Sequence, residues 1–135
     1  MKKKQVVICD IDGVLIENPL WDTLENFYEN IMDGWSNLWC EKLLNGLISQ
    51  GVYIIFVTAR NYRFHSFTKL QLRNCVGDKF DLYMRDKDDL RPDWQVKKDY
   101  LVELKEKYNI LFCIDDNIDN CNMYKDLGLV TLQVK

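Results

Sequence analysis

The feature that most constrains the fold is a short apolar run that ends in two acidic residues and a glycine. Residues 6–9 are β-branched residues and a cysteine that follow a lysine cluster, a pattern that predicts a buried strand. Asp10, Asp12 and Gly13 follow immediately. Because an unpaired buried charge is costly, a strand with this ending must reach a solvent-filled crevice. In an open parallel sheet, such a crevice lies at the carboxyl ends of the strands.

The two acids alone admit two interpretations. Two close carboxylates share a proton or hold a cation, and Gly13 lets the backbone turn sharply between them and the next residues. Alternatively, Asp10 and Asp12 mark only the exit of a strand into a loop with an Asx-type turn. The remainder of the chain decides between these interpretations.

Composition limits the class of protein. A chain of 135 residues, 47% of them hydrophobic, fits one globular domain, which we expect to cover residues 1–135. A net charge of −3 argues against non-specific coating of long nucleic acids, although it allows a protein that handles a nucleotide or a strand end.

The cysteines and the N-terminus predict a cytoplasmic protein. The five cysteines include no Cys-x-x-Cys pair and no zinc-ligand spacing, which favours a reducing compartment. The apolar run after the N-terminal lysines is too short for a signal peptide, and no apolar stretch is long enough to span a membrane.

Apolar runs and helical periodicity alternate along the chain and predict an α/β fold. The predicted strands cover residues 5–9, 52–57, 80–84, 110–114 and 129–134. The predicted helices cover residues 20–31, 36–49, 64–74, 94–108 and 118–127. This alternation predicts a mostly parallel sheet. The spacing of Trp21, Trp35 and Trp39 in and beside the first two helices favours packing in the core over a small lid.

Polar residues follow three of the predicted strands. They are Asp10 and Asp12, Thr58 and Arg60, and Asp115 and Asp116. Right-handed crossovers place the ends of parallel strands on one side, so these groups should converge. Lys97 or Lys98, near the start of a predicted helix, can reach the same edge.

This convergence predicts phosphoryl transfer. Several carboxylates at one crevice repel one another unless a cation compensates them, and oxygen-only ligands favour Mg²⁺ over Zn²⁺. Mg²⁺ commonly binds a phosphate as well, and Thr58 and a lysine can donate hydrogen bonds to phosphoryl oxygens. A carboxylate in line with phosphorus can act as a nucleophile. The residues therefore predict Mg²⁺-dependent chemistry through an aspartyl-phosphate.

The sequence resembles the haloacid dehalogenase (HAD) superfamily of phosphatases, whose four motifs appear in order over nearly the whole chain. They are Asp10-Ile11-Asp12-Gly13-Val14, Val57-Thr58-Ala59-Arg60, Lys97 and Ile114-Asp115-Asp116. The resemblance implies a three-layer Rossmann-like core, and the short segments between the motifs leave room for only a minimal cap.

The resemblance also implies a role for each motif. Asp10 would attack phosphorus, and Asp12 would protonate the leaving oxygen and then activate water. Thr58, Ala59, Arg60 and Lys97 would bind the phosphoryl group. The ligands of Mg²⁺ would be Asp10, the backbone carbonyl of Asp12, Asp115 and Asp116. Asp116 could instead cap the following helix, and Asp119 suits the dipole of that helix.

A narrower resemblance concerns residues 91–97, Arg-Pro-Asp-Trp-Gln-Val-Lys, which are similar to the 3′-phosphatase domain of phage-type polynucleotide kinase. It implies Lys97 rather than Lys98 as the phosphoryl-binding lysine, and Arg85 and Arg91 as substrate-binding residues. Arginines mixed with aromatics between residues 60 and 93 can also grip a phosphate and stack a base, or form an ordinary solvated helix face. No kinase-type Gly-x-x-x-x-Gly-Lys loop occurs, so we expect a stand-alone phosphatase.

Three functions therefore compete. The first is a phosphatase that acts on the 3′-phosphate of a nucleotide or a nucleic-acid end, and the second is a 5′(3′)-nucleotidase for free mononucleotides. The third is a phosphoacceptor receiver domain of a signalling protein, which also binds Mg²⁺ with acids. A receiver carries its acceptor acid after a middle strand, however, and no acid follows residues 52–57 here.

Overall fold

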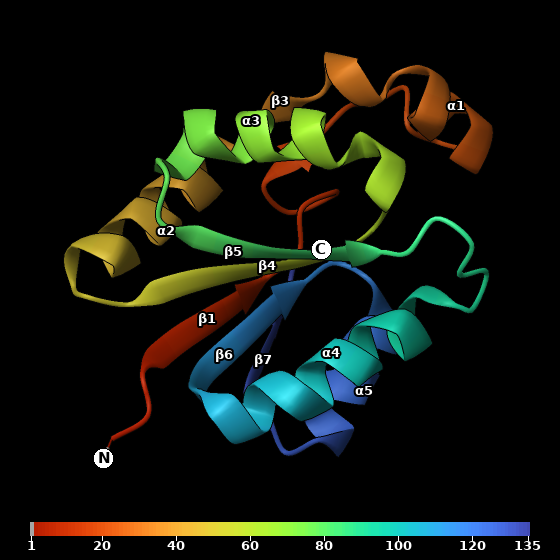
Figure 1. The fold of residues 1–135 in the computed structure, drawn as a ribbon. Coiled ribbons are helices and arrows are strands. Elements are labelled where there is room, and N and C mark those ends of the chain that lie inside the picture. The colour runs from red at the N-terminus through yellow and green to blue at the C-terminus, as the bar shows by residue number, and fades with distance from the viewer. Residues whose placement is uncertain (1) are drawn as a thin grey trace.

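A five-stranded, entirely parallel sheet lies at the centre of the computed structural model, which describes residues 2–135 (Figure 1). Its strands are β1 (Gln5–Cys9), β4 (Tyr53–Asn61), β5 (Phe80–Arg85), β6 (Asn109–Asp115) and β7 (Thr131–Gln133). Their order in the sheet is β5-β4-β1-β6-β7, with β1 in the middle. Met1, which the predicted domain includes, lies outside the described residues.

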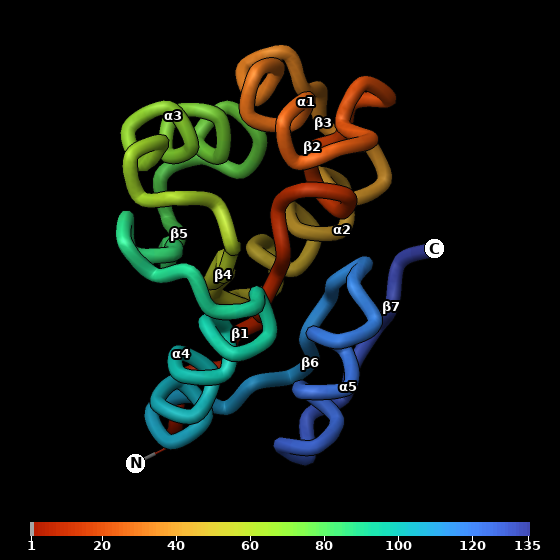
Figure 2. Tube along the Cα trace, turned by 90° about the vertical axis from the view of Figure 1, so that its right-hand side faces the viewer, coloured from red at the N-terminus to blue at the C-terminus, as the bar shows by residue number. Residues whose placement is uncertain are grey.

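Helices cover both faces of this sheet, as the α/β prediction requires. They are α2 (Leu38–Ser49), α3 (His65–Val76), α4 (Asp93–Lys107) and α5 (Ile118–Asp126). Figures 1 and 2 show α2 and α3 on one face and α4 and α5 on the other, which gives three layers. Within residues 2–135, none of the helices combines the length and the apolar character that crossing a membrane requires.

The central strands are buried on both faces, which explains their continuous apolar sequence. Along β1, Val7 and Cys9 pack in the cluster that includes Leu44 of α2. Val6 and Ile8 pack in the opposite cluster, which includes Leu101 of α4.

The register of the sheet brings three of the predicted motifs together. Cys9 pairs with Phe56 of β4 and with Ile114 of β6. Asp10, the next residue, donates its backbone N–H to the carbonyl of Ile114 at 3.0 Å and so lies between the two neighbouring strand ends. The prediction that these ends share one edge is therefore confirmed.

The segment between β1 and α2 forms a small cap, in a region where the sequence predicts only the helix over residues 20–31. It contains β2 (Ile16–Glu17), α1 (Leu24–Glu29), a 3₁₀ turn (Ile31–Asp33) and β3 (Trp35–Ser36). The two short strands pair antiparallel. Figure 1 places α1 and β3 on the same side of the sheet as α3.

The predicted helix over residues 20–31 is wrong in its extent, because polar side chains bind the backbone on either side of α1. The Thr23 hydroxyl accepts a hydrogen bond from Asn26 N at 3.1 Å and starts the helix there, and Asn18 accepts one from Leu20 N at 2.9 Å. Asn30 ends the helix: its side-chain Nδ2 donates to the carbonyl of Asn26 at 2.8 Å, and its backbone N–H donates to the carbonyls of Asn26 and Phe27.

The predicted core position of the three tryptophans is also wrong in part. Trp21 is half-buried, donates its indole N–H to the carbonyl of Asn30 at 3.0 Å and packs beside the core. Trp35 and Trp39 are about half exposed. Trp35 lies in β3 and so outside the predicted helix, whereas Trp39 lies in the first turn of α2, a helix that buries Cys40 and Leu44 instead.

Candidate active site

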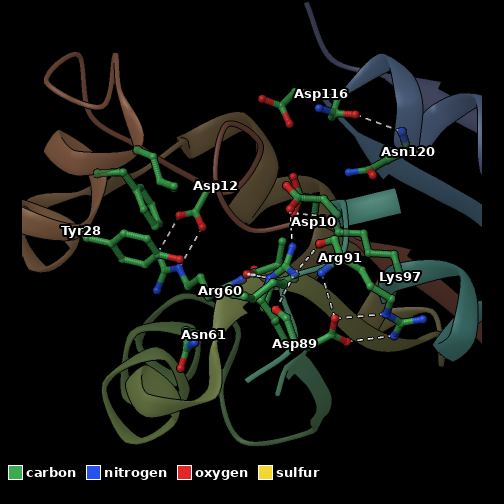
Figure 3. Close-up of a pocket in the computed structure, with 18 of the residues that line it drawn as sticks. Asp10, Asp12, Tyr28, Arg60, Asn61, Asp89, Arg91, Lys97, Asp116 and Asn120 are labelled. Carbon is green, nitrogen blue, oxygen red and sulfur yellow. Dashed lines mark hydrogen bonds and ion pairs between the residues drawn. The ribbon is translucent and has the colours of Figure 1, made fainter. Parts of the chain in front are cut away.

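The ends of β1, β4 and β6 open into a cavity of about 810 Å³ (Figure 3). Nine of the ten residues proposed from sequence line this cavity. They are Asp10, Asp12, Thr58, Ala59, Arg60, Arg85, Arg91, Lys97 and Asp116. The tenth, Asp115, is fully buried at the end of β6 and contacts the cavity through Lys97.

Lys97 joins two of the acids across the sheet. Its ammonium lies 2.9 Å from Asp10 Oδ1 and 2.8 Å from Asp115 Oδ2, and only 1% of the residue is exposed. It lies one turn into α4, on the face that also buries Val96 and Leu101. Burial alone would lower the pKa of Lys97, but the two carboxylates outweigh it and hold that pKa well above its usual value.

Two residues of α5 that sequence reasoning missed support Asp115. Tyr124 donates its hydroxyl to Asp115 Oδ2 at 2.9 Å, and Asn120 Nδ2 lies 3.2 Å from the same oxygen. They lie four residues apart on one helical face, a spacing that was visible in the sequence but had no apolar stripe to mark it. Despite burial, the charge of Lys97 and the hydrogen bonds from Lys97, the backbone N–H of Asn117 and Tyr124 keep the pKa of Asp115 below its usual value.

Asp10, Asp115 and Asp116 form an acidic cluster that suits a divalent cation. One carboxylate oxygen from each lies within 4.8 Å of the others. Burial raises the pKa of Asp10 well above its usual value, and burial with the charge of Asp115 raises the pKa of Asp116. Lys97 alone therefore does not compensate the cluster. The Oδ1 atom of Asn120 is buried without a hydrogen-bond partner in the described part of the chain.

This donor set fits Mg²⁺. It offers only oxygen ligands, its carboxylates need more positive charge, and the free amide oxygen of Asn120 can accept a hydrogen bond from a water molecule on the ion.

Gly13 allows Asp116 to approach the first motif. The backbone at Gly13 has φ +84°, in the left-handed region that favours glycine. A Cβ atom there would also collide with the carboxylate of Asp116. Position 13 therefore requires glycine both for the backbone conformation of the turn and for the close approach of Asp116. The sequence analysis identified only the turn.

Asp12 is held by Arg60 rather than by the cation cluster. Arg60 Nη2 lies 2.7 Å from Asp12 Oδ1, and Arg60 Nε lies 2.9 Å from Asp12 Oδ2 (Figure 3). Arg60 is 2% exposed, and its remaining terminal nitrogen donates to Thr68 at 3.1 Å and to Gln71 at 2.8 Å, both on α3. The sequence analysis placed Arg60 at the substrate phosphate; in this structure its side chain fixes the orientation of Asp12.

Thr58 lies in the extension of β4 beyond residue 57, where the pairing with β5 is irregular. Its hydroxyl oxygen accepts a hydrogen bond from the backbone N–H of Arg60 at 3.1 Å. Because a hydroxyl can accept and donate together, the Thr58 proton remains available to an oxygen in the cavity.

Arg85 and Arg91 organise the loop between β5 and α4. Arg85 donates to the backbone carbonyls of Ala59, Asp89 and Arg91 and to the carboxylate of Asp93. Arg91 pairs with Asp89 at 2.8 Å, and its hydrogen bonds lower the pKa of Asp89 to about 2. In this arrangement both arginines are paired within the protein, although both line the cavity.

The opposite wall of the cavity comes from the cap. Leu24, Phe27 and Tyr28 of α1 line it, and no sequence pattern indicated this because their spacing resembles that of a core helix. Figure 3 shows Tyr28 reaching across toward Asp12 and Arg60.

Comparison with known proteins identifies relatives of this chain. The family model for the polynucleotide kinase PNKP phosphatase domain matches residues 4–135. No curated protein matches the chain.

Solved structures share the fold. The chain superposes on one chain of the Pnkp1/Rnl/Hen1 RNA repair complex with a TM-score of 0.84 and 27% identity, over 98% of its own length. It spans only 42% of that longer chain. A class C acid phosphatase from Bacillus anthracis with tungstate bound gives a TM-score of 0.68 at 14% identity, covering 89% of this chain and 54% of the other.

A HAD family enzyme from Bacteroides thetaiotaomicron, in complex with magnesium and inorganic phosphate, gives a TM-score of 0.59 at 15% identity. The match covers 98% of this chain and 94% of that enzyme. At this identity the likeness concerns the fold.

Proposed function

The chain belongs to the PNKP phosphatase-domain family of the HAD superfamily, and from this premise we propose that it is a Mg²⁺-dependent phosphatase of 3′-phosphorylated nucleic-acid ends. The observation that carries the proposal is the contact of Lys97 with both Asp10 and Asp115 at a cavity that also holds the paired Asp12 and Arg60. This constellation combines a carboxylate nucleophile, a fixed second acid and a buried cation.

Asp10 acts first in this mechanism. A carboxylate oxygen of Asp10 attacks phosphorus, a bond forms between them, and the bond from phosphorus to the leaving 3′-oxygen breaks. Asp12 gives its proton to that oxygen, which leaves as a hydroxyl group. Asp12 then accepts a proton from water as the water oxygen attacks phosphorus. The bond between phosphorus and the Asp10 oxygen breaks, inorganic phosphate leaves, and the Asp10 carboxylate is restored.

Three side chains assist this sequence. Lys97, with its raised pKa, stays charged next to Asp10 and stabilises negative charge on the transferred phosphoryl group. Thr58 donates its free proton to a phosphoryl oxygen. Arg60 keeps the Asp12 carboxylate in one orientation at the cavity.

Mg²⁺ would be held by Asp10, Asp115 and Asp116, with the backbone carbonyl of Asp12 as a further ligand. When bound, the ion neutralises charge on the phosphoryl oxygens and offsets the mutual repulsion of the three carboxylates. The amide N–H of Asn120 would help to hold Asp115 in place as a ligand.

The relative in the RNA repair complex supports a strand end as the substrate, because that assembly is described as one for RNA repair. A free mononucleotide is the second candidate, favoured by the net charge of −3, which disfavours long contacts with a polyanion. Membership of a phosphatase family argues against the receiver-domain alternative. The five free cysteines support the proposed reducing, cytoplasmic location.

A phosphate-release assay tests this proposal. The substrates are DNA and RNA oligonucleotides with a 3′- or a 5′-phosphate, 3′- and 5′-mononucleotides, and glycerol phosphate, each with Mg²⁺ and with a chelator. We expect release from 3′-phosphorylated ends with Mg²⁺ only, and a loss of at least about 10³-fold in kcat for Asp10→Asn. Equal turnover without metal, or wild-type rates for Asp10→Asn, would exclude the proposed mechanism.

A further inference from the structure

Helix α1 uses its apolar side chains to line the cavity instead of the core. None of its six residues is buried, and Leu24 is 70% exposed. Leu24, Phe27 and Tyr28 nevertheless form one wall of the cavity that contains Asp10. Large apolar side chains that face a solvent-filled cavity usually contact a ligand, because leaving them in water forgoes their burial.

The ring of Tyr28 is held in a fixed place on this wall. It stacks on Phe64 with a centroid separation of 5.7 Å and an angle of 18°, and its centroid lies 5.2 Å from that of Phe27. The guanidinium of Arg63 lies 5.2 Å from the Tyr28 centroid. These supports come from α1 itself and from the 3₁₀ turn Tyr62–Phe64, so the ring is oriented before any ligand arrives.

The two ends of the cavity differ in chemistry. Figure 3 shows Asp10 and Lys97 on the side away from Tyr28, and these two residues act on the phosphoryl group under the proposed function. The other end holds the aromatic and aliphatic side chains of α1, and Figure 3 shows Tyr28 directed from there toward Asp12 and Arg60. A volume of about 810 Å³ is large enough for a nucleotide, whereas a sugar phosphate would leave the apolar wall unused.

We propose that Leu24, Phe27 and Tyr28 form a base-binding subsite, in which the nucleobase next to the phosphate under attack packs against the ring of Tyr28. The inference rests on the proposed function and deepens it, because it assigns the specificity for nucleotides to the cap. Stacking on an aromatic ring accepts any base, so the subsite recognises the presence of a base rather than its identity. A terminal nucleotide of a strand and a free 3′-mononucleotide present the same chemistry to it.

The first test needs no mutation. The wild-type enzyme is assayed with Mg²⁺ on a 3′-phosphorylated oligonucleotide with an ordinary terminal base and on the same strand with an abasic terminal residue. Removal of one base–aromatic stack should lower kcat/KM on the abasic end by about 5- to 150-fold. Equal kcat/KM on the two ends would overturn the subsite. A 3′-mononucleotide as a further substrate shows whether the base must belong to a strand.

Variants test whether Tyr28 causes the difference in kcat/KM between the base-bearing and the abasic end. Tyr28→Leu should lower kcat/KM on the base-bearing end by about the same factor, mainly through KM, and leave the abasic end within about twofold. Tyr28→Phe keeps the ring and should retain most of the activity. Tyr62→Leu is the matched control, because Tyr62 is an exposed tyrosine beside the same aromatic group that does not line the cavity.

The outcomes separate this inference from the function on which it rests. Equal losses for Tyr28→Leu on both ends would show a general structural role and overturn base stacking. If the wild type hydrolyses ordinary and abasic ends equally, the proposed function stands and the subsite fails. If the wild type releases phosphate only from glycerol phosphate, the proposed function fails, and the subsite fails with it.

Discussion

The guanidinium of Arg60 donates two hydrogen bonds to the carboxylate of Asp12, at 2.7 Å and 2.9 Å, although the two residues lie 48 positions apart in the chain. Arg60 itself donates hydrogen bonds to Thr68 and Gln71, so a buried side chain with a fixed position sets the orientation of the Asp12 carboxylate. A lysine would keep the charge but cannot form the two parallel bonds.

The variant Arg60→Lys should therefore fold and lose kcat. We expect a decrease in kcat of about 10- to 100-fold, the equivalent of one charge-assisted hydrogen bond, with a smaller change in KM. Steady-state kinetics on the preferred substrate measures the changes in kcat and KM separately. Arg73→Lys is the control, since Arg73 is half exposed and pairs with the exposed Asp78. An unchanged kcat for Arg60→Lys would remove Arg60 as the residue that positions Asp12.

Gly13→Ala should damage both the fold and the metal site. The substitution places a Cβ against the carboxylate of Asp116 and forces alanine into a backbone conformation with φ +84°. We expect a loss of about 1–3 kcal/mol in the free energy of unfolding. Gly46→Ala is the matched control, because Gly46 lies inside α2 and, apart from the adjacent backbone of that helix, no atom of residues 2–135 lies within 4 Å of the new Cβ. Alanine there should stabilise the protein by about 1 kcal/mol. Urea unfolding of both variants measures whether each substitution lowers or raises the free energy of unfolding.

Lys97→Met should destabilise the protein by about 3–5 kcal/mol in the absence of divalent metal. The substitution leaves the carboxylates of Asp10 and Asp115 buried without their cation. Millimolar Mg²⁺ should restore part of the loss, since it returns positive charge to the same acids. Lys98→Met, the neighbouring exposed position, should change stability by less than about 0.5 kcal/mol. A small loss of stability for Lys97→Met and a large one for Lys98→Met would contradict the assignment of Lys97 as the lysine that pairs with Asp10 and Asp115.

The strands of the sheet were predictable because burial on both faces leaves a continuous apolar signal. The cap was not predictable. Its turns depend on hydrogen bonds between the backbone and the side chains of Asn18, Thr23 and Asn37, and hydrophobic periodicity does not record such bonds. The apolar residues between positions 20 and 31 have the spacing of a core helix, but in the structure several of them line the cavity.

The acids and Lys97 of the site were predictable for a related reason. The acids directly follow the ends of adjacent parallel strands, and Lys97 lies one turn into α4; topology alone brings such positions together. The supporting residues were not. Asn120 and Tyr124 act through the face that α5 turns toward Asp115, and Gln71 acts through the packing of α3 beside Arg60. Such contacts depend on how a helix is rotated on the sheet, and the sequence does not specify that rotation.

The cysteines predict a pH-dependent reactivity. Burial raises the pKa of Cys75 to about 11, and it is the only one of the five cysteines that is not fully buried. Because the thiolate is the reactive form, alkylation of the folded protein should be slow at pH 8 and should increase with pH toward about 11, with Cys75 modified first. The unfolded chain should react at all five positions, with an ordinary thiol pKa. Mass spectrometry after timed alkylation identifies the sites, and early modification of Cys9 or Cys113 would contradict the buried positions found here.

Mg²⁺ should stabilise the folded protein, because the acidic cluster exists only when β1 and β6 are paired. At a concentration one hundred times its Kd, the ion adds about 2.7 kcal/mol to the free energy of unfolding, which for a domain of this size raises Tm by roughly 10 °C. Asp116→Asn should reduce the rise, since it removes one of the three carboxylates. Asp119→Asn should leave the rise unchanged, because Asp119 is exposed in the first turn of α5 and lies outside the cluster. Differential scanning calorimetry with and without Mg²⁺ measures both. If Asp119→Asn abolished the rise and Asp116→Asn did not, the ion would bind on the helix surface and the ligand set proposed here would be wrong.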